Sequence, residues 1–226
     1  MSHDSPVRGL RRIELRATNP AALADYYQQL LGWLILTAKD DTLTCWVGER
    51  QAAHIRTPQP HEQPGWHLIF SGPNPRTLTD TTHTTAHIHH GRAQHGPWAP
   101  PPRPGEPCWT ELTTPTDTTH DYWATELGWT NTTPGLFHAC GPDGHTHRPI
   151  ASHTHHPHTS TWTCYFAVHD VHKAATLATE LGGTIHTPPH THPTGLTTTI
   201  TDPAGNTCAL LQTPPAWGGT THTTTP

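Results

Sequence analysis

Two glutamates occupy matching positions in two similar segments of the chain. Glu14 lies in IELRATNPAALADYYQQLLGW (13–33), and Glu111 lies in WTELTTPTDTTHDYWATELGW (109–129). Alternation along a strand places Glu111 on the same face as Trp109. A carboxylate that is partly desolvated beside an aromatic ring has a raised pKa, which suits general acid or base catalysis. Glu14 and Glu111 are therefore the candidate catalytic residues.

The neighbours of the two glutamates differ. Arg12 and Arg16 share the strand face of Glu14, so a salt bridge is the alternative role for that carboxylate. Glu111 has no cation at the equivalent positions of its own strand. This contrast makes Glu111 the stronger catalytic candidate, because a carboxylate without a cationic partner is more readily perturbed.

Histidines indicate a second kind of chemistry. His67 lies in GWHLIF, His54 lies in AAHI, and His87 and His89 lie in AHIHH. Three neutral imidazoles, or two with a carboxylate such as Glu14, bind a divalent metal and leave a position open for substrate. A site of this kind, with His67 and His54 as ligands, would take Zn, Ni, Fe or Mn. The alternative is that these are ordinary polar side chains in a chain that contains 23 His.

The elements that must position these residues form a repeat. Each of the two segments predicts a strand, a turn, an amphipathic helix and a closing Leu-Gly-Trp, whose glycine suits a left-handed helix end. Two further segments, starting with GWHLIF and TWTCYFAVHD, give four units in two halves. The second unit is truncated, because few residues remain between Phe70 and the Pro-rich linker at 96–107.

Taken in order, these segments resemble the vicinal oxygen chelate superfamily, which includes glyoxalases, bleomycin-resistance proteins and extradiol dioxygenases. The resemblance rests on the two segments that end in Leu-Gly-Trp, on YFAVHDV with the later Gly182-Gly183, and on DPAGN at 202–206. The chain looks most like the tandem, two-module actinobacterial members. This resemblance implies an α+β fold of tandem βαβββ units, pairs of which curl into two half-open barrels. The concave face of each barrel, here called a cup, would hold a ligand or metal.

The resemblance also implies boundaries for the modules. The first module is expected at 9–100, with units one and two, and the second at 106–213. The low-complexity end, 214–226, is expected to be a disordered tail. Trp33 and Trp129, which follow the two helices, are expected to be core anchors, since Trp is highly buried on average.

The ligand positions of metal-using family members can be carried onto this chain by aligning the units. They fall at Arg12, His67, Trp109, Thr163 and Ala209, and only His67 is a competent ligand. The resemblance therefore implies that the second cup binds no metal. The main prediction is that the protein uses no cofactor. The residues expected to bind a ligand in the two cups are Trp109, Thr163, Tyr165, Arg12 and Arg16.

Most of the remaining histidines are expected to lie away from the cups. Six of them fall in GHTHRPIASHTHHPH (144–158), which is predicted to be a surface loop because its Pro and Thr neighbours give no fixed geometry. The hairpin at 186–192 carries others and is also placed outside the cup strands.

Composition excludes several classes of function. The chain has 226 residues, a formal net charge of -5 and only 12 Lys plus Arg, so nucleic acid is a poor partner. Five Cys form no CxxC pair, which favours a reducing cytoplasm over a disulfide or zinc framework. The sequence contains no apolar run long enough to predict a membrane span. The chain is expected to be a monomer or homodimer that binds a small molecule.

These observations lead to a main function and two alternatives. The main prediction is that a metal-free cup binds a small aromatic natural product. The cup either sequesters this compound in antibiotic resistance or performs an acid–base tailoring step with Glu111. The first alternative is a metal-dependent lyase, isomerase or dioxygenase that uses His67 with His54. The second is a non-catalytic, His-rich metal-binding protein.

Overall fold

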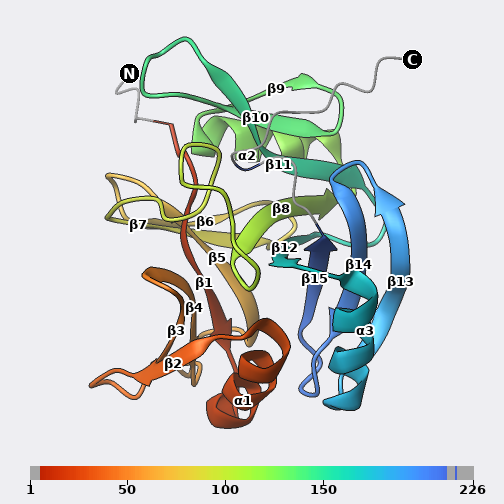
Figure 1. The fold of residues 1–226 in the computed structure, drawn as a ribbon. Coiled ribbons are helices and arrows are strands. Elements are labelled where there is room, and N and C mark those ends of the chain that lie inside the picture. The colour runs from red at the N-terminus through yellow and green to blue at the C-terminus, as the bar shows by residue number, and fades with distance from the viewer. Residues whose placement is uncertain (1–5, 213–216, 218–226) are drawn as a thin grey trace.

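A computed structural model describes residues 6–212 and residue 217. In this part of the chain the strands form two mixed sheets, one of seven strands and one of eight, and the α+β class is confirmed (Figure 1). The first sheet has the strand order β2-β3-β4-β1-β5-β7-β6, and the second has the order β13-β14-β15-β12-β8-β11-β10-β9.

The elements of the first sheet and its helix are β1 (Leu10–Arg16), α1 (Pro20–Leu31), β2 (Leu34–Thr37), β3 (Leu43–Val47), β4 (Arg50–Arg56), β5 (Gly65–Ser71), β6 (Arg76–Thr79) and β7 (Thr85–His89). Those of the second sheet are β8 (Pro107–Thr114), α2 (Asp117–Leu127), β9 (Trp129–Thr133), β10 (Leu136–Cys140), β11 (His147–His155), β12 (Thr161–Val168), α3 (Val171–Glu180), β13 (Thr184–His192), β14 (Gly195–Thr201) and β15 (Thr207–Gln212).

The same strand pairing occurs four times. In each unit the first strand pairs in parallel with the last, as β1 does with β4, β5 with β7, β8 with β11 and β12 with β15. The first strands of neighbouring units pair antiparallel, β1 with β5 and β8 with β12. The first strands therefore lie at the middle of each sheet. Their side chains on the concave face of the sheet form the floor of each cup.

The helix ends agree with the repeat that the sequence predicts. Asn19 caps α1 by accepting a hydrogen bond from the Ala22 N–H at 3.2 Å, and Pro20 follows at the first helical position. Gly32 and Gly128 end α1 and α2 with φ of 72° and 65°, the left-handed region that a residue with a Cβ rarely adopts.

The second unit is truncated as predicted. After β5 the chain passes directly into the β6–β7 hairpin, and the described residues 65–89 contain no helix. The parallel pairing of β5 with β7 survives this loss, since Ile69 still lies opposite His87. The strand that carries His67 therefore keeps its place in the first cup.

Aromatic side chains pack between the two sheets. The Trp66 and Phe166 rings lie 5.4 Å apart, and those of Phe70 and Trp162 lie 6.1 Å apart, joining β5 to β12. Trp33 and Trp129 are buried, so their predicted role as core anchors is confirmed. Burial of such large apolar surfaces between the layers is the main stabilising term in a fold of this kind.

A buried cation holds the Pro-rich linker between the sheets. Arg50 of β4 donates to the Pro100 and Pro101 carbonyl oxygens, both at 2.8 Å, and pairs with the Glu106 carboxylate. The linker is therefore fixed by hydrogen bonds as well as by the restricted backbone of its prolines. No helix among residues 6–212 is long and apolar enough to cross a membrane.

Candidate functional site

A row of polar side chains crosses the first cup. The strand register places Glu14 of β1 opposite His54 of β4 on one side and His67 of β5 on the other. The imidazoles of His67 and His87 lie 5.7 Å apart, which extends the row to β7. The sequence-predicted residues of the first module are thus neighbours in the fold.

Arginines hold the Glu14 carboxylate. Its Oε1 accepts hydrogen bonds from Arg16 Nε at 2.7 Å and from an Arg56 guanidinium nitrogen at 2.8 Å. Burial alone would raise the pKa of Glu14, but the two guanidinium groups outweigh it and lower the pKa below its usual value. Glu62 joins the same cluster through Arg56. Glu14 is therefore a salt-bridged anion, which is the alternative role that its neighbours indicated.

Two histidines of this cup, His54 and His87, use a ring lone pair within the protein. His54 Nε2 accepts from the Gln51 amide nitrogen at 2.7 Å, and His87 Nε2 accepts from Arg16 at 3.2 Å. Burial and a nearby arginine lower the pKa of both to about 4, so both imidazoles are neutral at pH 7. His67 Nε2 donates to the Gln63 carbonyl oxygen at 2.9 Å.

These contacts do not fit a divalent metal in the first cup. A metal needs free lone pairs that converge on one point, whereas His54 and His87 already accept hydrogen bonds and Glu14 faces two guanidinium groups. Within residues 6–212 and residue 217, no group of three or more His, Cys, Asp or Glu side chains is arranged to hold a metal ion.

The second cup is organised around Glu111. Glu111 lies opposite Ser152 of β11 on one side and Thr163 of β12 on the other. Trp109 Nε1 donates to Ser152 Oγ at 2.9 Å, and Ser152 Oγ donates to Glu111 Oε2 at 2.9 Å. In the described part of the chain the only ion-pair partner of Glu111 is His192, whose Nε2 lies 3.5 Å from Oε2.

Aromatic rings lie around the Glu111 carboxylate and its partners. Tyr165 lies opposite Trp109 in the strand register, and burial together with the Glu111 charge raises the pKa of the phenol. The indole of Trp217 lies against Trp109, with ring centroids 6.0 Å apart, and is 2% exposed. The second cup thus combines an acceptor carboxylate, hydroxyl groups and closely packed aromatic rings.

Trp217 is held by an irregularity in β11. Where β11 pairs with β10, Phe137 lies opposite Ala151 and His138 lies opposite Pro149, so Ile150 is the extra residue of a bulge. The Ile150 carbonyl oxygen accepts a hydrogen bond from Trp217 Nε1 at 3.0 Å. The bulge therefore provides an acceptor for an aromatic N–H beside Trp109.

Two sequence predictions around the second cup are corrected, and a third falls largely outside the described residues. The tract 144–158 is not all loop, because residues 147–155 form strand β11 and Ser152 reaches Glu111. The His-rich hairpin does not lie wholly outside the cups, since His192 also reaches Glu111. The predicted disordered tail, 214–226, lies outside the described residues apart from Trp217, which is buried.

The missed residues carried weak local signals. The apolar pair Ile150-Ala151 inside the His-rich tract is the one hint of a half-buried strand, and both residues are buried. A tryptophan in a polar tail is the corresponding hint for Trp217. The remaining predicted ligand-binding residues stay on the cup strands, with Arg12 and Arg16 on β1 and Thr163 on β12.

Comparison with known proteins places this fold in a family. The model of the Glyoxalase/Bleomycin resistance protein/Dioxygenase superfamily matches residues 9–210. No curated protein matches the chain in sequence.

Solved structures give similar arrangements. The 2,3-dioxygenase LapB from Pseudomonas sp. KL28 has a TM-score of 0.60 and 13% identity, with 93% of each chain covered. The Mn(II)-bound glyoxalase from Novosphingobium aromaticivorans has a TM-score of 0.59 and 10% identity, covering 98% of this chain and 86% of that one. Homoprotocatechuate 2,3-dioxygenase from Arthrobacter globiformis has a TM-score of 0.59 and 14% identity, covering 92% and 80%. Because the family model spans nearly the whole described chain and the paired βαβββ sheets match these two-module structures, the chain belongs to the glyoxalase, bleomycin-resistance and dioxygenase superfamily.

Proposed function

We propose that the protein binds a small, flat aromatic molecule in its second cup without a metal, and that Glu111 accepts a hydrogen bond or a proton from it. The observation that carries this proposal is the position of Trp217. An indole already packs against Trp109, with the two rings tilted at 51° to each other, and donates to the Ile150 carbonyl oxygen, beside the Ser152 hydroxyl that bonds to Glu111. A surface that accommodates this ring suits a ligand of similar shape.

Two uses of such a cup fit the family. Bound in a closed aromatic site, a toxic natural product is sequestered, and resistance follows from binding alone. In a tailoring step of secondary metabolism, the Glu111 carboxylate removes a proton from the bound ligand, while Ser152 and Tyr165 hold the carboxylate in place. A general base of this kind contributes about 10²- to 10⁴-fold to a rate. The likeness to tandem actinobacterial members stays a prediction, as does the absence of a cofactor.

Replacing Trp217 with Gly should open a cavity that binds free indole. We expect indole to raise the melting temperature of Trp217→Gly by about 3 °C at ten times its dissociation constant, because a ligand that binds only the native state stabilises it. Differential scanning fluorimetry and isothermal titration calorimetry measure the two quantities. In the wild type the Trp217 indole competes for the same site, so free indole should bind more weakly and raise the melting temperature less than in Trp217→Gly.

Trp46→Gly is the matched control. Trp46 is a half-buried tryptophan on β3 of the first sheet, and its removal leaves the second cup intact. Equal stabilisation of the two variants by indole would mean that indole binds elsewhere. If indole did not bind to Trp217→Gly, the proposed aromatic binding site in the second cup would be contradicted.

Replacing Glu111 with Gln should stabilise the protein, by about 1 kcal/mol at pH 7. The carboxylate is largely buried and has no arginine or lysine partner among the described residues, so neutralising it removes a desolvation cost. Residues kept for function are commonly suboptimal for stability. Urea denaturation of Glu111→Gln and the wild type measures the difference.

Glu14→Gln is the comparison variant for this experiment. It leaves Arg16 and Arg56 without their shared partner and should lower the stability by about 3 kcal/mol. A similar loss in Glu111→Gln would assign Glu111 a structural role. With an identified ligand, lost turnover and retained binding in Glu111→Gln would indicate acid–base chemistry, whereas lost binding alone would indicate sequestration.

A further inference from the structure

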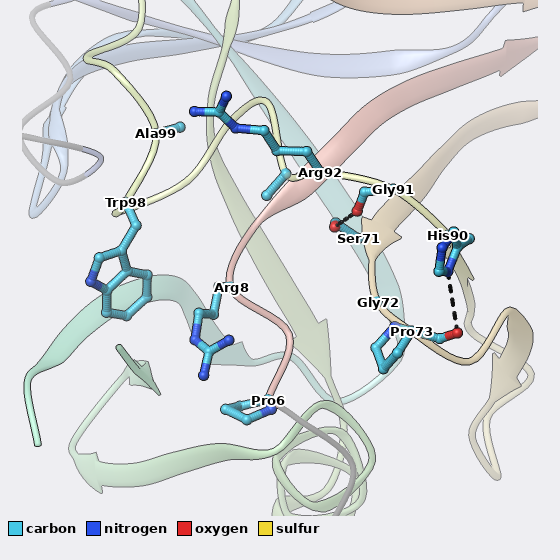
Figure 2. A pocket seen from close by; sticks show the side chains of 11 residues that line it. Pro6, Arg8, Ser71, Gly72, Pro73, His90, Gly91, Arg92, Trp98 and Ala99 are labelled. Carbon is cyan, nitrogen blue, oxygen red and sulfur yellow. Dashed lines mark hydrogen bonds between the residues drawn. The ribbon is translucent and has the colours of Figure 1, made fainter. Parts of the chain in front are cut away.

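A separate cavity lies away from both cups. It has a volume of about 390 Å³ and is lined by the N-terminal segment, the ends of β5 and β7 and the Pro-rich linker. Figure 2 shows Arg8, Arg92 and Trp98 around this opening, with Ser71 and His90 beside it. The volume is in the range of small-molecule sites in proteins.

The charge of this cavity contrasts with that of the whole chain. The protein has a formal net charge of -5, yet the described residues that line the cavity include Arg8, Arg92 and His90 and no aspartate or glutamate. Positive side chains around an opening whose lining includes no carboxylate raise the local concentration of anions and steer them to it.

The two arginines keep donors for a ligand. Arg8 donates to the Cys140 carbonyl oxygen at 2.9 Å through Nε and to the Gly141 carbonyl oxygen at 3.4 Å through Nη2. These bonds orient its guanidinium group but leave the positive charge uncompensated. Arg92 is exposed, and the described residues provide it with no ion-pair partner. A planar guanidinium with free N–H groups matches the oxygens of a carboxylate or phosphate.

Trp98 gives the cavity a rigid, flat wall. The Arg148 guanidinium carbon lies 5.7 Å from the centre of its ring, in a cation–π contact. Gly141 permits this placement, because a Cβ at that position would come within 3.1 Å of Trp98 Nε1. A ring held in this way can stack on a flat ligand at little cost in side-chain entropy.

We propose that this cavity binds a small organic anion, a carboxylate or phosphate group attached to a flat ring. The anionic group would pair with Arg8, and the ring would lie on Trp98. The exposed Arg92 side chain, which points away from Arg8 in Figure 2, would turn toward the bound anion. This proposal does not depend on the function of the second cup, because the two sites share no lining residue and each is tested by its own variants.

Isothermal titration calorimetry with phenyl phosphate and benzoate tests the proposal. We expect both to bind the wild type, more weakly as salt is added, and the neutral analogue benzyl alcohol not to bind. The stronger of the two anions identifies the preferred headgroup. Arg92→Gln should weaken binding about tenfold, the value of one charge-assisted hydrogen bond. The exposed side chain of Arg92 makes this variant expected to fold normally.

Lys39→Gln is the matched control, since it removes one positive charge from an exposed position outside the cavity lining and should leave binding unchanged. Trp98→Leu should weaken phenyl phosphate about fivefold and leave inorganic phosphate unaffected, which separates the stacking role from the charge. Equal affinity of wild type and Arg92→Gln for both aryl anions, or equal binding of benzyl alcohol, would overturn the proposal.

Discussion

Glu106→Gln should destabilise the protein by about 3–5 kcal/mol, the usual cost of removing one partner from a buried ion pair. Glu106 is 0% exposed and pairs with Arg50 and Arg103. Without its charge, the largely buried Arg50 guanidinium remains between β4 and the start of β8 with only carbonyl oxygens as acceptors. Equilibrium urea denaturation, followed by tryptophan fluorescence, measures the loss.

Glu49→Gln is the control for this prediction. Glu49 also pairs with Arg103, at 3.3 Å, but its side chain is 83% exposed. A solvated ion pair contributes little to stability, so this variant should unfold almost as the wild type does. If Glu106→Gln and Glu49→Gln lost equal stability, the buried pair would not be what joins β4 to the linker.

Lowering the pH from 7 to 4 should destabilise the protein, and His95 should account for up to about 3 kcal/mol of the loss. Its imidazole is 2% exposed, and Nε2 donates to the Gln51 carbonyl oxygen at 2.9 Å. Burial lowers the pKa of His95 from 6.5 to about 4. The folded protein therefore holds this ring neutral over a range in which the unfolded chain protonates it.

The sign follows from the protons that each state binds. Between pH 6.5 and about 4 the unfolded state binds more protons than the folded state, so the free energy of unfolding rises with pH in this window. Above pH 6.5 the contribution of His95 to stability is complete. His95→Gln retains a donor for Gln51 and removes the titrating group. Its stability should change less between pH 7 and 4 than that of the wild type.

Denaturation midpoints at several pH values test this expectation. His145→Gln, which removes an exposed imidazole, is the matched control and should follow the wild-type dependence on pH. An unchanged dependence in His95→Gln would show that other groups, such as the half-buried His54 and His87 of the first cup, carry the acid sensitivity.

Much of the fold was predictable because its signals are local. The left-handed glycines that end α1 and α2 are properties of a few consecutive residues, as is the Pro-rich linker. Two-residue periodicity likewise places Glu111 and Trp109 on one strand face, and the structure links them through Ser152. Repetition of the pattern then predicts the paired units, because similar segments form similar elements.

The candidate site was only partly predictable. The sequence by itself determined the positions of Glu14 and Glu111 on equivalent first strands, and the arginines beside Glu14 indicated its salt bridges. It did not determine which side chains surround Glu111. Ser152, His192 and Trp217 come from segments whose polar composition is typical of loops or tails.

Only the tertiary structure determined that Ser152, His192 and Trp217 lie around Glu111 and Trp109. Strand β11 forms because its backbone pairs with β8 and β10, and its bulge frees the Ile150 carbonyl oxygen for Trp217. Such pairings join residues far apart in the chain, and their stability comes from ladder hydrogen bonds and burial that no short window of sequence contains. Local patterns therefore determined the strands and the carboxylate, and long-range pairing decided what lies against it.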